Sequence, residues 1–173
     1  MNETLQTILS RVSVKKYKSD PVPKEMIEKI VEAGLSAPSG LNKQSAIILA
    51  VTNKQVRDEL SLINAGKDPF KRADPFYGAP CVLVVLADKS IPTHVYDGSL
   101  VMENLLLAAH SLGLGACWIH RARETFEQPL WQAFLQKLGI EGEYEGIGNC
   151  VIGYPDVVPE QKPRKENRVY YIE

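Results

Sequence analysis

The sequence predicts a single domain, residues 1–173, in which helices and strands alternate, so the class is α/β or α+β. Three observations indicate this. The length of 173 residues fits one domain of roughly 100–200 residues. The composition, 45% hydrophobic and 24% charged, is that of a globular protein and excludes disordered, collagen-like and coiled-coil chains. Segments with helical apolar spacing alternate with short apolar runs typical of buried strands.

The first half of the chain is expected to contain three helices and one strand. Asn2 can cap a short helix over residues 2–10. The apolar residues of 26–34 recur at i, i+3 and i+4, which is the pattern of an amphipathic helix. The apolar run 46–52 predicts a buried strand, and Asn53 can cap the helix that follows it.

The second half begins with a long loop, residues 64–80, rich in Gly, Pro and charge, and loops of this length are often functional. Three further apolar runs predict strands at 81–87, 116–120 and 147–154. Helical patterns cover 97–112, which Gly113 ends, and 127–139. The Pro-rich tail 155–173 ends in the β-prone segment VYYI, which suggests docking elsewhere, for example on another subunit.

The charges are distributed unevenly. Twenty Lys and Arg against 21 Asp and Glu leave a net charge of −1, which argues against general nucleic-acid binding. Yet residues 11–18 hold four basic side chains and no acid, and residues 161–168 hold four basic side chains and one Glu. Two basic segments therefore stand near opposite ends of an otherwise acidic chain.

The cysteines and hydropathy indicate a protein of a reducing compartment. Cys81, Cys117 and Cys150 lie in apolar runs without a C-x-x-C pair, as expected of reduced core thiols. The N-terminal segment has no apolar signal-peptide core, and no apolar stretch reaches the roughly 18–20 residues that span a bilayer. We expect a cytoplasmic protein that does not bind membranes.

Arg11, Ser13 and Lys15 predict an anion-binding row. In an extended segment, residues two apart point to the same side, so a guanidinium, a hydroxyl and an ammonium are presented together. Lys162 and Arg164 repeat this spacing in the tail. Like charges stay close only around an anion, although each segment could also be an ordinary solvated strand edge or tail.

The loop from Ala37 to Gln44 offers backbone amides and the side chains of Asn42 and Gln44. These side chains both donate and accept hydrogen bonds, so they can bind the edge of a ring that presents N–H beside C=O. The loop could also be a plain connector.

Gly113-Leu-Gly115 leaves a helix and enters a strand, the reverse of a dinucleotide-binding loop. The three histidines lack metal-site spacing. With no acid–base or nucleophile constellation either, a bound cofactor is expected to supply the reactivity.

Five segments in order resemble the FMN-dependent nitroreductase family. RVSVKKY is similar to its R-R-S-x-R-x-[FY] motif, and APSGLNKQ to A-P-S-x-x-N-x-Q-P-W. The segments YGAPCVLVV, LGLGACWI and IGYP…KPR complete the set. The resemblance runs from Arg11 to the tail. The chain departs from the family at Val12, Gly40, Ser45-Ala46 and His120.

The resemblance implies an α+β three-layer sandwich with a mostly antiparallel central sheet, in a homodimer that exchanges its C-terminal strands and holds two FMN molecules at the interface. The phosphate would be held by Arg11, Ser13, Lys162 and Arg164, with Val12 beside them and Lys15 near the flavin's pyrimidine edge. From the second subunit would come Pro38, Ser39, Gly40, Asn42 and Gln44. Ala116, Cys117 and Trp118 would contribute backbone contacts near flavin N5. Whether His120 or Lys71 reaches the site stays open.

The implied activity is a ping-pong reductase. Hydride would pass from NADH or NADPH to flavin N5, and then to a nitroaromatic, a quinone or a related small acceptor, with no side chain acting as nucleophile and no metal. Two alternatives stay open within the flavoproteins: a relative that fragments flavin, dehalogenates or oxidises a peptide heterocycle, and a non-catalytic flavin-binding or redox-sensing protein. A phosphopeptide- or nucleotide-binding module would explain the basic segments but not the Asn/Gln loop.

Overall fold

The computed structural model describes residues 1–66 and 73–173, and an antiparallel sheet forms its centre. Its order in the described chain is β1-β2-β4-β3, so β4 lies inside the sheet and β3 at one edge. The strands are β1 (Ala46–Val51), β2 (Cys81–Asp88), β3 (Gly115–Ile119) and β4 (Tyr144–Gly153). The four predicted strands are confirmed, and β4 begins three residues earlier than expected.

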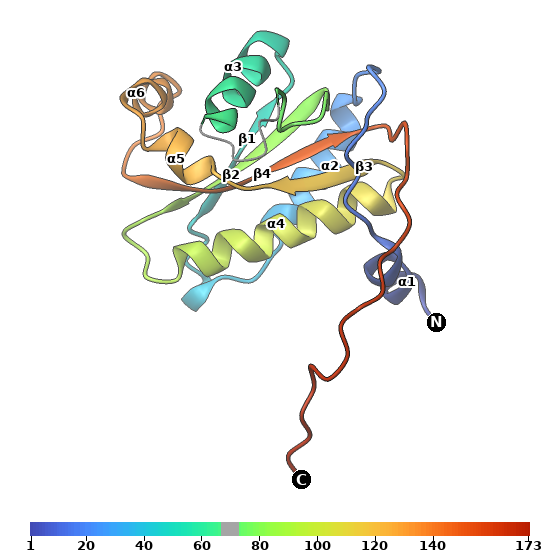
Figure 1. Ribbon diagram of the computed structural model, residues 1–173. Helices are drawn as coiled ribbons and strands as arrows, with labels where there is room; N and C mark the ends of the chain where they lie inside the picture. The colour runs from blue at the N-terminus through green and yellow to red at the C-terminus, as the bar shows by residue number, and fades with distance from the viewer. Residues whose placement is uncertain (67–72) are drawn as a thin grey trace.

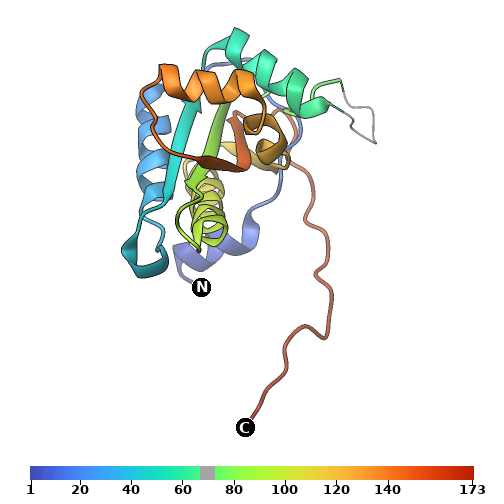
Figure 2. The ribbon, with the colours of Figure 1, turned by 90° about the vertical axis from the view of Figure 1, so that its left-hand side faces the viewer.

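Helices cover both faces of the sheet (Figure 1, Figure 2). On one face lie α2 (Lys24–Leu35) and α4 (His94–Ser111), and on the other α3 (Lys54–Ala65), α5 (Ala122–Phe126) and α6 (Pro129–Lys137). Alternate residues of β2 enter the two cores: Leu83 and Val85 face α2 and α4, whereas Val82 and Val84 face α3 and α6. The fold is therefore the α+β three-layer sandwich, and the α/β alternative is excluded.

The predicted caps are present. The side chain of Asn2 accepts a hydrogen bond from the amide of Leu5 at 2.9 Å, and that of Asn53 accepts one from the amide of Val56 at 3.1 Å. Two helical details differ from expectation. α4 begins three residues before Asp97, which places this carboxylate in the first turn, and the five-residue α5 is too short to show an apolar period.

The two ends of the chain project from the sandwich. Helix α1 (Glu3–Ser10) has no buried residue within the described chain, and its Leu5 is 49% exposed. The tail leaves the body after β4 and extends away from it (Figure 1), with Tyr170 to Ile172 exposed. These apolar side chains are exposed to solvent in the single subunit. The exchange of the tail with a partner subunit stays a prediction.

Several expectations concern the interior and the surface as a whole. All three cysteines are buried thiols, and burial raises the pKa of Cys81 to about 12. Over residues 1–66 and 73–173, no helix is long and apolar enough to cross a membrane, and no three His, Cys, Asp or Glu side chains group as metal ligands. Part of the predicted loop 64–80, including Lys71, lies outside the described residues.

Candidate cofactor site

The basic segment 11–18 is attached to the edge strand β3. Ser13 forms a parallel bridge with Ala116, and the amide of Val14 donates to the carbonyl of Ala116 at 3.0 Å. The Val14 side chain is buried against Gly115, where an added Cβ would lie 2.8 Å from it. The segment is therefore extended and pinned by Val14, as the alternation predicted, with Ser13 and Lys15 left exposed.

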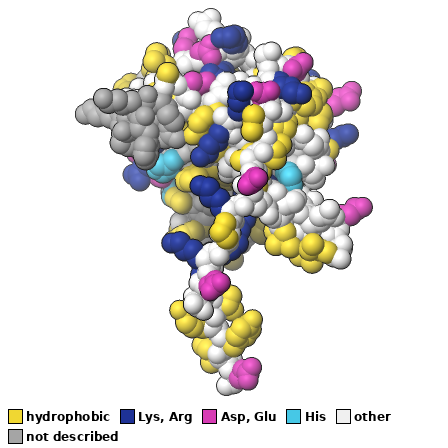
Figure 3. Space-filling model, turned by 45° about the vertical axis from the view of Figure 1, so that its right-hand side comes forward, with side chains coloured by type: hydrophobic (Ala, Val, Ile, Leu, Met, Phe, Trp, Pro, Cys, Tyr) yellow, Lys and Arg dark blue, Asp and Glu magenta, His cyan; other side chains and the backbone are white. Residues whose placement is uncertain are grey.

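The tail meets this segment beyond the end of β4. Tyr17 bridges Pro155, and Lys16 contacts Asp156 twice, through its carbonyl to the Asp156 amide (3.0 Å) and through Nζ to the carboxylate (2.7 Å). Further along, the side-chain amide of Gln161 donates to the carbonyl of Leu9. The two ends of the chain are thus brought together, and dark blue Lys and Arg side chains gather where the tail leaves the body (Figure 3).

A cavity of about 590 Å³ lies between the segment and the tail. It is lined by Arg11, Val12, Ser13, Lys15, Lys162 and Arg164, together with neighbouring residues of both stretches. Residues more than 140 positions apart in the sequence therefore share one basic cavity. The predicted phosphate-binding group is brought together as expected.

Arg11 lines this cavity with a buried cationic donor. Its Nη1 is buried and has no hydrogen-bond partner among the described residues. A buried cationic donor without an acceptor is costly, because it loses its hydration and gains nothing in exchange. The arrangement fits a ligand that brings a negative charge to this guanidinium.

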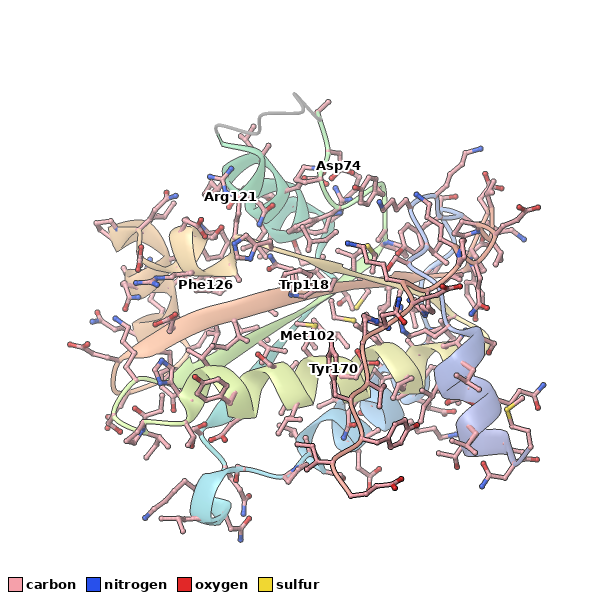
Figure 4. All side chains as sticks on the ribbon, turned by 60° about the horizontal axis from the view of Figure 1, so that its bottom comes forward. Asp74, Met102, Trp118, Arg121, Phe126 and Tyr170 are labelled. Atoms are coloured by element: carbon pink, nitrogen blue, oxygen red, sulfur yellow. The ribbon has the colours of Figure 1, made fainter. Side chains whose placement is uncertain are left out.

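A second cavity, of about 400 Å³, begins at Arg11 and Ser13 and extends between β3 and α4. Its walls include Met102 and Leu106 of α4, Ile147 of β4 and the half-exposed Trp118. Trp118 and Met102 both lie next to Gly148, where an added Cβ would be 2.4 Å from the indole Nε1 and 3.1 Å from the Met102 methyl group. Figure 4 labels Trp118 on the sheet and Met102 on α4. Ser99 and Glu103 of α4 also line this cavity. A basic end joined to a partly apolar wall suits an anionic ligand with an apolar body.

The other residues predicted on β3 contribute differently. Ala116 and Cys117 have buried side chains, so only their backbone can face a ligand at this edge of the sheet. The ring of His120 lies 5.5 Å from that of Trp118, centroid to centroid. His120 therefore adjoins a residue that lines the second cavity, without lining it itself.

Lys15 lies beside the end of the predicted loop 64–80, where sequence reasoning missed the role of Asp74. Its ammonium lies 5.9 Å from the centroid of the Tyr77 ring. Asp74 shapes this turn by accepting hydrogen bonds from the amides of Phe76 (2.9 Å) and Gly78 (2.7 Å), and from Arg57 (2.7 Å). Burial raises the pKa of Asp74, but a hydrogen bond from the Ser61 hydroxyl (2.6 Å) and the three bonds above outweigh it and hold the pKa below its usual value. An Asp in a Gly/Pro-rich loop gives no sequence signal of such a role.

The loop from Pro38 to Gln44 lies apart from the basic cavity. It is fixed to the first turn of α4, where the amide of Gly40 donates to Asp97 at 3.0 Å. Arg11 lies near the other half of the same helix, because Glu103 and Leu106 line the second cavity with it. At 1.5 Å per residue, Asp97 and Leu106 are roughly 13 Å apart along the helix. Within one chain, the structure does not bring Pro38, Ser39, Gly40, Asn42 and Gln44 to the other predicted site residues (Figure 1).

Fold and site together define an α+β sandwich with a basic, partly apolar ligand site on the edge strand. The chain belongs to the nitroreductase family, whose family model matches residues 8–154. It is 30% identical to an NADPH-flavin oxidoreductase of Vibrio harveyi, over 95% of this chain and 70% of that protein. A relative from Methanothermobacter thermautotrophicus is 32% identical, over 67% of this chain and 60% of its own length.

Two solved structures are similar over their whole length. A nitroreductase with bound FMN from Bacteroides fragilis superposes with a TM-score of 0.87 at 27% identity, and one from Desulfitobacterium hafniense with a TM-score of 0.89 at 26% identity. Each comparison covers 100% of both chains.

Proposed function

We propose that this protein is an FMN-dependent oxidoreductase that uses NADH or NADPH to reduce a small acceptor such as a nitroaromatic or a quinone. The buried Nη1 of Arg11, which has no partner within residues 1–66 and 73–173 and lies where two cavities meet, carries this proposal. FMN has a phosphate for the basic cavity and a flat ring for the wall around Trp118, and the family and its FMN-bound members agree with it. When bound, FMN supplies hydride transfer through N5.

The residues of this chain then bind and orient the cofactor. Arg11, Ser13, Lys162 and Arg164 hold the phosphate with charge-assisted hydrogen bonds. Lys15, whose ammonium lies 5.9 Å from the centroid of the Tyr77 ring, supplies a positive charge that favours the negative charge of reduced flavin. The backbone of Ala116 to Trp118 and the apolar wall of α4 orient the ring and limit its contact with water.

We infer that the active form is a homodimer. Helix α1 exposes Leu5 and Leu9, and the tail exposes Tyr170 to Ile172. Exposed apolar side chains that gather in this way mark a protein–protein interface. The loop with Asn42 and Gln44 lies far from the basic cavity of its own chain, so a second subunit is needed to complete the site. The three buried thiols fit a reducing compartment, and we propose the cytoplasm.

The spectrum of the purified protein and its response to nicotinamides test the proposal. FMN-loaded protein mixed anaerobically with NADH or NADPH is expected to lose its visible absorbance within seconds and to regain it with a quinone or a nitroaromatic. Initial rates over both substrates should give the parallel double-reciprocal lines of a ping-pong reaction. Bound flavin that neither nicotinamide reduces would contradict the proposal and favour a flavin-binding sensor.

A further inference from the structure

Asp97, in the first turn of α4, accepts hydrogen bonds from three donors on two parts of the chain. Its side chain is only 3% exposed. Oδ1 accepts from the amide of Gly40 (3.0 Å), and Oδ2 accepts from the hydroxyls of Ser45 (2.7 Å) and Thr93 (3.1 Å). Burial raises the pKa of Asp97, but these hydrogen bonds outweigh it and keep the pKa below its usual value, so the carboxylate is ionised at neutral pH.

The residues between Gly40 and Ser45 have a strained backbone. Leu41, Asn42 and Gln44 all adopt left-handed conformations, with φ of 51°, 53° and 48°. Non-glycine residues keep such conformations only where the surroundings impose them. Leu41 is 92% exposed and anchors nothing, so packing does not impose the conformation.

This segment is restrained from within and from its two ends. Within it, the amides of Asn42 and Lys43 donate to the carbonyls of Ser39 and Gly40, at 3.0 Å each. Asp97 binds both Gly40 and Ser45 and so brackets the strained residues, while the amide of Gln44 donates to the Ser39 hydroxyl at 2.9 Å. Gly40 is required for this closeness, because a Cβ there would lie 2.4 Å from the Thr93 hydroxyl oxygen. A side chain at position 40 would therefore displace either the loop or Thr93 from the carboxylate.

We propose that Asp97 is a positioning residue that holds the 39–45 loop in the strained form in which Ser39, Asn42 and Gln44 are presented to FMN bound by a second subunit. This inference rests on the proposed function. The side chains of Asn42 and Gln44 already bond to each other at 3.2 Å and are exposed, as groups directed at an external ligand would be. Asp97 itself does not touch the cofactor.

The test measures the loop and the ligand separately. In apo-protein, Asp97→Ala should speed amide hydrogen exchange over residues 39–45, and it should raise the Kd for FMN at least about tenfold, because bonds to a charged group are lost. Asp97→Asn should lie between wild type and Asp97→Ala, because its amide oxygen can still accept from Gly40. Leu135→Ala, a core truncation in α6, is the control: it should lower Tm without changing either loop exchange or FMN affinity.

The possible outcomes are distinct. Unchanged loop exchange in Asp97→Ala, or an unchanged Kd despite faster exchange, would overturn the inference, as would an equal loss of FMN affinity in Leu135→Ala. If Asp97→Ala does not fold, Ser45→Ala and Thr93→Val each remove one of the three donors to the carboxylate and should each raise the Kd about threefold, less than Asp97→Ala because the other two bonds remain; no change in either variant would overturn it. If wild type itself does not bind FMN, the proposed function fails, whereas loop exchange still reports on Asp97.

Discussion

At the scale of single residues, Arg11 bears the cost of a buried donor without an acceptor among the described residues, and in the proposed function FMN offsets this cost. Its Nη1 is buried without an acceptor in the described part of the chain, whereas the other polar groups of the segment reach solvent or a partner. Replacing an unpaired buried charge by an apolar side chain of similar length is often neutral or stabilising. An apolar side chain at position 11 should therefore maintain or raise the stability of the apo-protein and weaken the binding of FMN.

Arg11→Met is expected to leave the Tm of apo-protein unchanged or to raise it, because the desolvation cost is removed. The same variant should lose most of the stabilisation that saturating FMN gives to wild type. Thermal unfolding with and without FMN measures both effects. A variant that is strongly destabilised without FMN would show that Arg11 is a structural residue instead.

The buried thiols predict a loss of stability at alkaline pH. Burial raises the pKa of Cys81 from 9.0 to about 12 and also raises the pKa values of Cys150 and Tyr17. Because the folded state keeps these protons longer than the unfolded state, their contribution is present below pH 9 and is lost as the pH rises toward 12. Tm should fall over this range, and less steeply in Cys81→Ala. Equal slopes in the two proteins would show that Cys81 does not contribute.

At the scale of elements, the sequence was informative where local pattern decides the structure. Continuous apolar runs marked β1 and β2 almost to the residue. β2 is buried on both faces, which leaves few alternatives, whereas β1 lies at an edge of the sheet and is only partly buried. The five residues of α5 contain too little of a helical period to be found. The sequence also indicated that Arg11 and Ser13, two apart in an extended segment, face the same side, and both line the same two cavities.

The roles of Asp97 and Asp74 could not be read from the sequence. A carboxylate in the first turn of a helix is explained by the helix dipole alone, and nothing local says that Asp97 reaches Gly40, 57 residues earlier. Asp74 similarly accepts from the amides of a turn, and its other contacts include an ion pair with Arg57 of α3, 17 residues earlier, at 2.7 Å. Both roles depend on tertiary contacts made by a polar side chain, and such contacts produce no periodic pattern in the sequence.

The attachment of the basic segment to β3 depends on a glycine. In Gly115→Ala the new Cβ would overlap Val14, so we expect a destabilisation of about 1–3 kcal/mol and weaker FMN binding as residues 11–15 shift. Gly113→Asn is the matched control, since φ is +78°, no atom lies within 4 Å and Asn tolerates this conformation. Denaturant unfolding and FMN titration of both proteins measure the effects. Equal effects would show that the contact with Val14 is unimportant.

At the scale of the whole molecule, two helix layers and a sheet form the body, while α1 and the tail present apolar side chains outward. Both lie at the end of the sandwich that carries the basic cavity, and they touch through Gln161 and Leu9. In the proposed dimer, the same association buries these side chains and completes the cofactor site.

Leu5→Glu should therefore shift the protein from dimer to monomer and reduce its FMN content. Leu62→Glu is the control, because Leu62 is 72% exposed on α3 in the opposite helix layer and should tolerate the charge. Light scattering coupled to size exclusion, with flavin absorbance recorded on the same peaks, measures both properties. A Leu5→Glu protein that remains a fully loaded dimer would contradict the proposed interface.

The central claim is that residues from the two ends of the chain hold one phosphate group. The ratio of the Kd values for riboflavin and FMN isolates that group, because the two ligands differ only in the phosphate. Wild type is expected to prefer FMN at least about a hundredfold, and the double variant Arg11→Met, Arg164→Met to prefer it by less than about tenfold, with riboflavin affinity little changed. A preference that is the same in both proteins would contradict the account.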